Sequence, residues 1–111
     1  SVDTPTCAAS VRRFNAELNQ RGDVTVLCIS ADLPFALARF CGAEGLERVV
    51  PLSDLRDKGF GDRYGLRLVD GPLAGLLARA VVVVKGGTVA YAQLVPVIAD
   101  EPDYAAALAA V

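Results

Sequence analysis

The chain has 111 residues, 53% of them hydrophobic, and a formal net charge of −2 at neutral pH. This length suits one domain with a single core, and the mixed charges lack the basic stripe that would indicate a nucleic-acid or membrane-surface partner. Histidine is absent, which excludes Ser-His and Cys-His catalysis and histidine-based zinc sites.

The first predicted element is an amphipathic helix over residues 5–20 with a cysteine in its first turn. Asp3 or Thr4 can act as its N-cap, and Pro5 suits the first helical position. Free backbone N–H groups and the helix dipole favour a thiolate at that end. Cys7 is therefore a candidate reactive thiol.

The next segment, residues 24–30, is almost wholly apolar and rich in β-branched side chains. This composition predicts an interior strand covered on both faces. Cys28 lies within it, and we interpret this thiol as structural because burial raises a thiol's pKa.

A second helix is expected to start at Pro34, with Asp32 or Leu33 near its cap, and to end near Gly42 or Gly45. Cys41 lies on this helix, 34 residues after Cys7 (41 − 7). A dithiol mechanism is therefore available without a Cys-x-x-Cys motif. On its own, an apolar helix position would make Cys41 a core residue more often than a catalytic one.

After a short strand at residues 49–52, Ser53 is predicted to cap a short helical stretch that ends at Lys58. Residues 59–75 contain five glycines and one proline. We expect this segment to be an irregular connection with one or two short strand pieces.

Residues 79–85 and 88–95 predict two strands of an antiparallel hairpin, because Gly86-Gly87 between them favours a tight turn. The apolar run at residues 80–84 is far shorter than the roughly 20 residues that a membrane-spanning helix needs. A final alanine-rich helix is expected over residues 103–110.

The predicted order of elements is that of the α/β thioredoxin fold, a central mixed sheet flanked by helices, without its first core strand. Residues 24–30 and 79–85 would then flank an open slot of unpaired backbone groups. We therefore expect the chain to be an N-terminally incomplete single domain (residues 1–111) that does not fold stably alone.

Three runs carry a specific resemblance to a known family: SVDTPTCAASVRRFN, CISADLPFALARFCGAEGLE and DGPLAGLLARAVVVV. They resemble the bacterial thiol peroxidases, which are atypical two-cysteine peroxiredoxins with a thioredoxin-like fold. Peroxiredoxins share a Pro-x-x-x-Thr/Ser-x-x-Cys motif, of which Thr4 and Cys7 supply the second half. The motif's proline and the family's N-terminal strands lie outside this sequence.

The resemblance implies roles for four residues. Cys7 would be the peroxidatic cysteine, and Cys41 would resolve it through an intrachain disulfide. Thr4 would hydrogen-bond the thiolate and the peroxide, and Arg79 would stabilise the thiolate and the developing oxyanion. Because the first turns of two packed helices usually lie farther apart than the roughly 7 Å between disulfide-linked Cα atoms, we expect local unfolding around both cysteines on oxidation.

The same resemblance implies hydrogen peroxide and alkyl hydroperoxides as substrates, thioredoxin as reductant, and a homodimer. It implies no metal or organic cofactor, no nucleic-acid or membrane partner, and a bacterial cytoplasmic location with the periplasm as the alternative. Two rival functions stay open. One is a redox sensor that uses the same disulfide, and the other is a noncatalytic interaction module whose cysteines are core residues.

Overall fold

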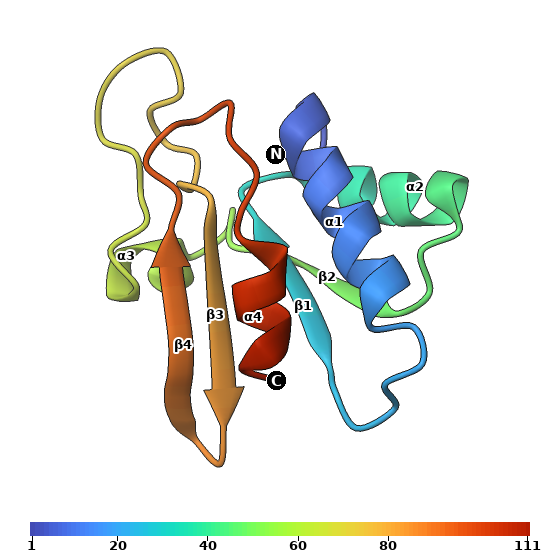
Figure 1. The fold of residues 1–111 in the computed structure, drawn as a ribbon. Helices are drawn as coiled ribbons and strands as arrows, with labels where there is room; N and C mark the ends of the chain where they lie inside the picture. The colour runs from blue at the N-terminus through green and yellow to red at the C-terminus, as the bar shows by residue number, and fades with distance from the viewer.

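Four helices and four strands make up the fold in the computed structural model, which describes all 111 residues (Figure 1). Their order and bounds are α1 (Pro5–Glu17), β1 (Val26–Ser30), α2 (Pro34–Glu44), β2 (Val49–Ser53), α3 (Gly59–Arg63), β3 (Ala80–Lys85), β4 (Thr88–Leu94) and α4 (Tyr104–Ala109). None of the helices combines the length and the apolar character needed to cross a lipid bilayer.

Helix α1 begins at Pro5, as the sequence predicts, and Thr4 is its N-cap residue with an extended backbone. The Thr4 side chain does not cap the helix and instead donates a hydrogen bond to the carbonyl of Ser1 at 2.9 Å. No acidic side chain lies in the first turn. The first turn of the helix itself therefore contributes no carboxylate beside Cys7.

Helix α2 starts after Leu33, again with proline in the first turn, and ends at Gly45. Gly45 has φ +65°, the left-handed conformation typical of helix ends, whereas Gly42 lies inside the helix. Leu37 is 1% exposed and anchors the helix to the core.

Strands β1 and β2 pair in parallel, from Val26 opposite Val49 to Ser30 opposite Ser53. Helix α1 packs against both strands, and α2 packs against β2. The expected burial of β1 on both faces is wrong, because Leu27 is 53% exposed. The Leu27 side chain is therefore largely accessible to solvent.

Strands β3 and β4 form the expected antiparallel hairpin. Gly86 and Gly87 connect them, both with positive φ (59° and 79°), a conformation that glycine adopts without steric cost. The register shifts between Val83 and Val84, which marks an irregularity in the pairing. Helix α4 packs against β3.

The segment after β2 differs from the prediction. Ser53 does not cap a helix; its hydroxyl accepts a hydrogen bond from the Leu55 N–H (3.2 Å) and starts a turn. The helix in this region, α3, begins only at Gly59, after Lys58 has adopted a left-handed conformation (φ 58°).

The glycine-rich connection is organised by a carboxylate that is 4% exposed, that of Asp54. It accepts hydrogen bonds from the Gly61 N–H (3.0 Å) and from Arg67 Nη2 (2.6 Å). The expected strand pieces reduce to one antiparallel bridge between Arg67 and Leu77. A buried ion pair therefore orders a segment that composition alone describes as irregular.

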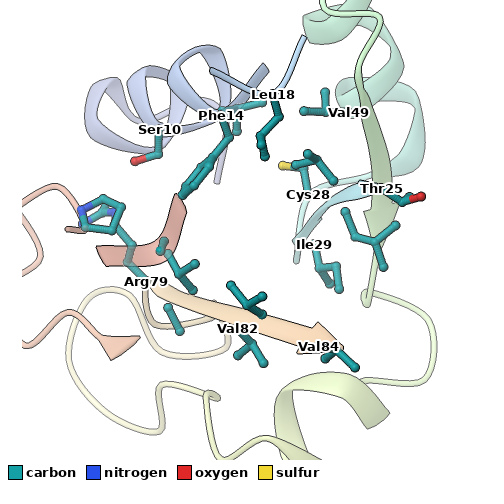
Figure 2. Close-up of a pocket in the computed structure, with 18 of the residues that line it drawn as sticks. Ser10, Phe14, Leu18, Thr25, Cys28, Ile29, Val49, Arg79, Val82 and Val84 are labelled. Atoms are coloured by element: carbon teal, nitrogen blue, oxygen red, sulfur yellow. The ribbon is translucent and has the colours of Figure 1, made fainter. Parts of the chain in front are cut away.

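The two sheets are not hydrogen-bonded to each other: β1 pairs with β2, and β3 pairs with β4. A cavity of about 690 Å³ separates them, lined by both β1 and β3 and by one face of α1. Figure 2 shows Phe14, Leu18 and Cys28 directed into this space. The expected slot is thus confirmed, and the single central mixed sheet is replaced by a parallel pair and an antiparallel pair. Instability of the isolated chain stays a prediction.

Candidate active site

Cys7 and Arg79 lie 72 residues apart in the sequence and meet at one end of the cavity. Arg79 Nη2 is 3.1 Å from Cys7 Sγ. The guanidinium is held from its other side, because Nη1 donates to the carbonyls of Ile98 (2.5 Å) and Asp100 (2.8 Å). Its Nε is buried and has no hydrogen-bond partner. The loop between β4 and α4 therefore aims a fixed positive charge at the thiol.

The environment of Cys7 favours its thiolate. Burial alone raises the pKa of this thiol, whereas hydrogen bonds with Thr4 and Arg79 and the positive charge of Arg79 lower it. The net result is a pKa below the ordinary value for cysteine. A lowered pKa in a half-buried, electropositive site is the usual mark of a reactive thiol.

Thr4 lies between the thiol and the first residue of the chain. Its hydroxyl donates a hydrogen bond to the Ser1 carbonyl. A hydrogen bond from the same hydroxyl to the Cys7 thiolate would lower the pKa of that thiol. Since the hydroxyl can rotate, the proton can serve either acceptor. The structure therefore places Thr4 and Arg79, the two residues that the family resemblance assigns to the site, close to Cys7.

The other two cysteines have a different environment. All three thiols are free. Burial raises the pKa of Cys28 to about 11, and burial also raises the pKa of Cys41 above its ordinary value. No hydrogen bond joins Cys41 to Cys7, Thr4 or Arg79. The interpretation of Cys28 as an inert thiol is consistent with its raised pKa, and the structure leaves Cys41 outside the Cys7 cluster.

Sequence reasoning considered Asp32 only as a helix cap and missed its main contacts. Its carboxylate accepts hydrogen bonds from Ser1 Oγ (2.6 Å), the Val2 N–H (2.8 Å) and Ser30 Oγ (2.8 Å). The only local signal was the Ser-x-Asp pattern at the end of a strand. The contacts with residues 1 and 2 span about thirty residues of sequence and could not be read from it.

A second missed residue is Tyr104, at the start of α4. Its hydroxyl lies 3.1 Å from Ser10 Oγ and donates to Glu101 (2.7 Å). Its ring packs against Phe14 with 5.3 Å between ring centroids, and the Arg13 guanidinium lies 4.8 Å from its centroid. These contacts hold α4 against the helix that carries Cys7.

No three potential metal ligands among the aspartate, glutamate and cysteine side chains lie close enough together to hold a metal ion. The chemistry that the site itself can perform is that of a nucleophilic thiolate beside an immobile guanidinium. Such a pair can attack an electrophile and stabilise the negative charge that develops on its leaving atom.

Comparison with known sequences agrees with this chemistry. The Redoxin family model matches residues 1–108. The thiol peroxidases of Mycobacterium tuberculosis (strain H37Rv) and Mycobacterium bovis are each 61% identical to the chain over 111 residues, 99% of its length. The chain spans 66% of the length of these relatives.

Solved structures with similar folds include a peroxiredoxin-like protein from Aquifex aeolicus, with a TM-score of 0.92 and 41% identity over 98% of this chain and 64% of that one. A thiol peroxidase from Chromobacterium violaceum has a TM-score of 0.81 and 27% identity over 89% and 57% of the two chains. Reduced Prx3 from Vibrio vulnificus, at 18% identity, shares the fold with a TM-score of 0.74 over 97% and 67%. With its resemblance to thiol peroxidases confirmed and its thioredoxin-like peroxiredoxin fold established, the chain belongs to the Redoxin family.

Proposed function

We propose that the protein containing this chain is a thiol-dependent peroxidase that reduces hydrogen peroxide and alkyl hydroperoxides through Cys7. The observation that carries the proposal is the 3.1 Å contact between Arg79 Nη2 and Cys7 Sγ, in a site that lowers the pKa of the thiol. The names of the mycobacterial relatives support the same activity.

In the proposed reaction, the Cys7 thiolate attacks the terminal oxygen of the hydroperoxide. The O–O bond breaks, an S–O bond forms, and the leaving oxygen departs as water or an alcohol after it takes a proton; Cys7 becomes a sulfenic acid. Arg79 would stabilise the negative charge on the leaving oxygen.

Resolution would use Cys41. Its thiolate attacks the sulfenic sulfur, an S–S bond forms, and the S–O bond breaks; the departing hydroxide takes up a proton and leaves as water. Both thiols are free and lie on separate helices in this structure, and we expect this step to proceed through local unfolding of the cysteine-bearing segments. We include thioredoxin as the reductant, a homodimer, and the bacterial cytoplasm in the proposal on the strength of the family resemblance.

The test is thioredoxin-coupled consumption of an alkyl hydroperoxide by the protein and three cysteine variants. Cys7→Ser should abolish turnover, whereas Cys41→Ser should permit one turnover and leave a sulfenic acid that dimedone traps. Cys28→Ser is the matched control and should retain turnover. Full turnover by Cys7→Ser would refute the proposal.

The two rival functions give different results in the same assay. A redox sensor would form the Cys7–Cys41 disulfide once without sustained peroxide consumption. A noncatalytic interaction module would form no such disulfide after one equivalent of peroxide. The lowered pKa of Cys7 counts against the second rival, because an inert core thiol has no need of a stabilised thiolate.

A further inference from the structure

The carboxylate of Asp32 connects three parts of the chain. Oδ1 accepts a hydrogen bond from Ser1 Oγ at 2.6 Å, and Oδ2 accepts from the Val2 N–H and from Ser30 Oγ, both at 2.8 Å. Val2 and Ser30 are buried, with 6% and 7% of their surface exposed. Asp32 thus joins the residues that precede α1 to the end of β1 and to the start of α2.

The loop that carries Asp32 is itself anchored on the neighbouring strand. Ser53 Oγ donates to the Asp32 carbonyl (2.5 Å), and the Asp54 N–H donates to the Ser30 carbonyl (2.9 Å). Burial raises the pKa of Asp32, but its hydrogen bonds with Ser1, Val2 and Ser30 outweigh this and lower it, so the group is ionised at neutral pH. The carboxylate is therefore a charged acceptor on a fixed support.

The contacts continue from Ser1 towards the thiol. The Ser1 carbonyl accepts hydrogen bonds from the Thr4 N–H (3.1 Å) and from Thr4 Oγ1 (2.9 Å). Thr4 is the N-cap residue of α1, three residues before Cys7 in the first turn. A shift of Ser1 would therefore move Thr4 and, with it, the first turn that presents Cys7 to Arg79.

We infer that Asp32 is a positioning residue for Cys7: by holding Ser1 and Val2 it keeps the thiol within reach of both Thr4 and Arg79. Asp32 touches neither the thiol nor a reacting atom and acts through the backbone of residues 1–4. Because α2 starts two residues later, the same carboxylate fixes the Cys7 and Cys41 segments relative to each other in the reduced state. This role in peroxide reduction rests on the proposed function.

Asp32→Ala removes all three acceptor contacts. We expect the pKa of Cys7 to rise towards the ordinary thiol value and its reaction with peroxide at pH 7 to slow about tenfold, because a smaller fraction of the thiol is then ionised. The pKa is measured from the pH dependence of iodoacetamide alkylation at Cys7, followed by peptide mass spectrometry. Circular dichroism checks that the variant is folded.

Two further variants separate positioning from a general loss of structure. Asp32→Asn should restore most of the reactivity, because its amide oxygen can accept from Val2 and Ser30 while its amide group faces Ser1. Asp3→Ala is the matched control: Asp3 is exposed, belongs to the same segment, and its carboxylate makes no hydrogen bond. We expect this control not to raise the pKa of Cys7.

A folded Asp32→Ala variant with unchanged alkylation and peroxide kinetics would overturn the inference. If Asp32→Ala does not fold, the double variant Ser1→Ala/Ser30→Ala tests the inference instead, because it removes two of the three donors to the carboxylate. A rise in the pKa of Cys7 in this variant supports the inference. An unchanged pKa of Cys7 overturns it. If the wild-type protein is alkylated rapidly at Cys7 but does not reduce peroxide, the proposed function is wrong. The role of Asp32 is still tested in that case, by comparing the alkylation of Cys7 in the wild-type protein and in Asp32→Ala.

Discussion

Arg12 and Glu44 form a two-point ion pair that joins the helix of Cys7 to the helix of Cys41. Arg12 Nε and Nη2 donate to the two carboxylate oxygens of Glu44 at 2.8 and 2.7 Å. The Arg12 guanidinium also lies 5.7 Å from the centroid of the Phe40 ring. Since Glu44 is the last residue of α2, this contact holds the end of the helix that would open in the proposed disulfide formation.

Glu44→Gln should therefore speed formation of the Cys7–Cys41 disulfide after peroxide addition. Both side chains are partly exposed, so the pair stabilises the end of α2 only weakly and the rate should rise about twofold. Quenched-flow alkylation of the remaining free thiols measures the rate. Glu17→Gln is the control, because its partner Arg13 belongs to the same helix; an equal effect of both variants would contradict the link between α1 and α2.

Replacement of Arg79 should slow the reaction of Cys7 with peroxide. Arg79→Ala removes a hydrogen bond and a positive charge from the thiol, and we expect a loss of about 10²-fold with a higher Cys7 pKa. Arg79→Lys keeps the charge but cannot contact the thiol and both carbonyls at once, so it should recover only part of the rate. Stopped-flow kinetics with an alkyl hydroperoxide measures both variants. Arg21→Ala, which breaks an exposed ion pair with Asp23, is expected to react normally.

The pH dependence of thiol modification should differ among the three cysteines. The pKa of Cys7 is lowered, so its alkylation rate should fall only when the pH drops below that value, while Cys41, whose pKa is raised by burial, reacts at higher pH. Site-resolved alkylation between pH 5 and pH 10 gives both profiles. Overlapping profiles for Cys7 and Cys41 would show that the Thr4 and Arg79 contacts do not act on the thiol.

Burial of Cys28 should reduce the stability of the fold at alkaline pH. Its pKa is raised from 9.0 to about 11, so between these values the unfolded chain loses its proton while the folded chain retains it. The free energy of unfolding should fall across this range by at most about 3 kcal/mol from this group. Urea denaturation of the protein and of Cys28→Ala at pH 8 to 11 tests this. If the free energy of unfolding of Cys28→Ala fell equally steeply with pH, the loss of stability would come from groups other than Cys28.

Much of the fold follows from local sequence signals. Proline at the start of α1 and α2, glycine at the end of α2, and Gly86-Gly87 in the hairpin each favour one backbone conformation. The short helix α3 was missed because its start depends on a left-handed Lys58 and on Asp57 Oδ1, which accepts a hydrogen bond from the Gly59 N–H (2.9 Å). Composition alone does not encode that arrangement.

The site was predictable in part for a different reason. Cys7 was identified as a candidate from its place in a helix, but its partner Arg79, 72 residues away, was assigned a role only by family resemblance. The contacts of Asp32 and Tyr104 were not predicted, because they join distant segments that only the folded chain brings together. Long-range polar contacts of this kind have no periodicity for a sequence pattern to reveal.

Because Arg79 is held by the carbonyls of Ile98 and Asp100, the reactivity of Cys7 depends on an intact loop between β4 and α4. A protease that cut the backbone between these residues, or an insertion that lengthened the loop, would release the guanidinium although Cys7, Thr4 and Arg79 all remained in the chain. Cleavage in that loop would thus lower the reactivity of Cys7 without changing any residue that contacts the thiol.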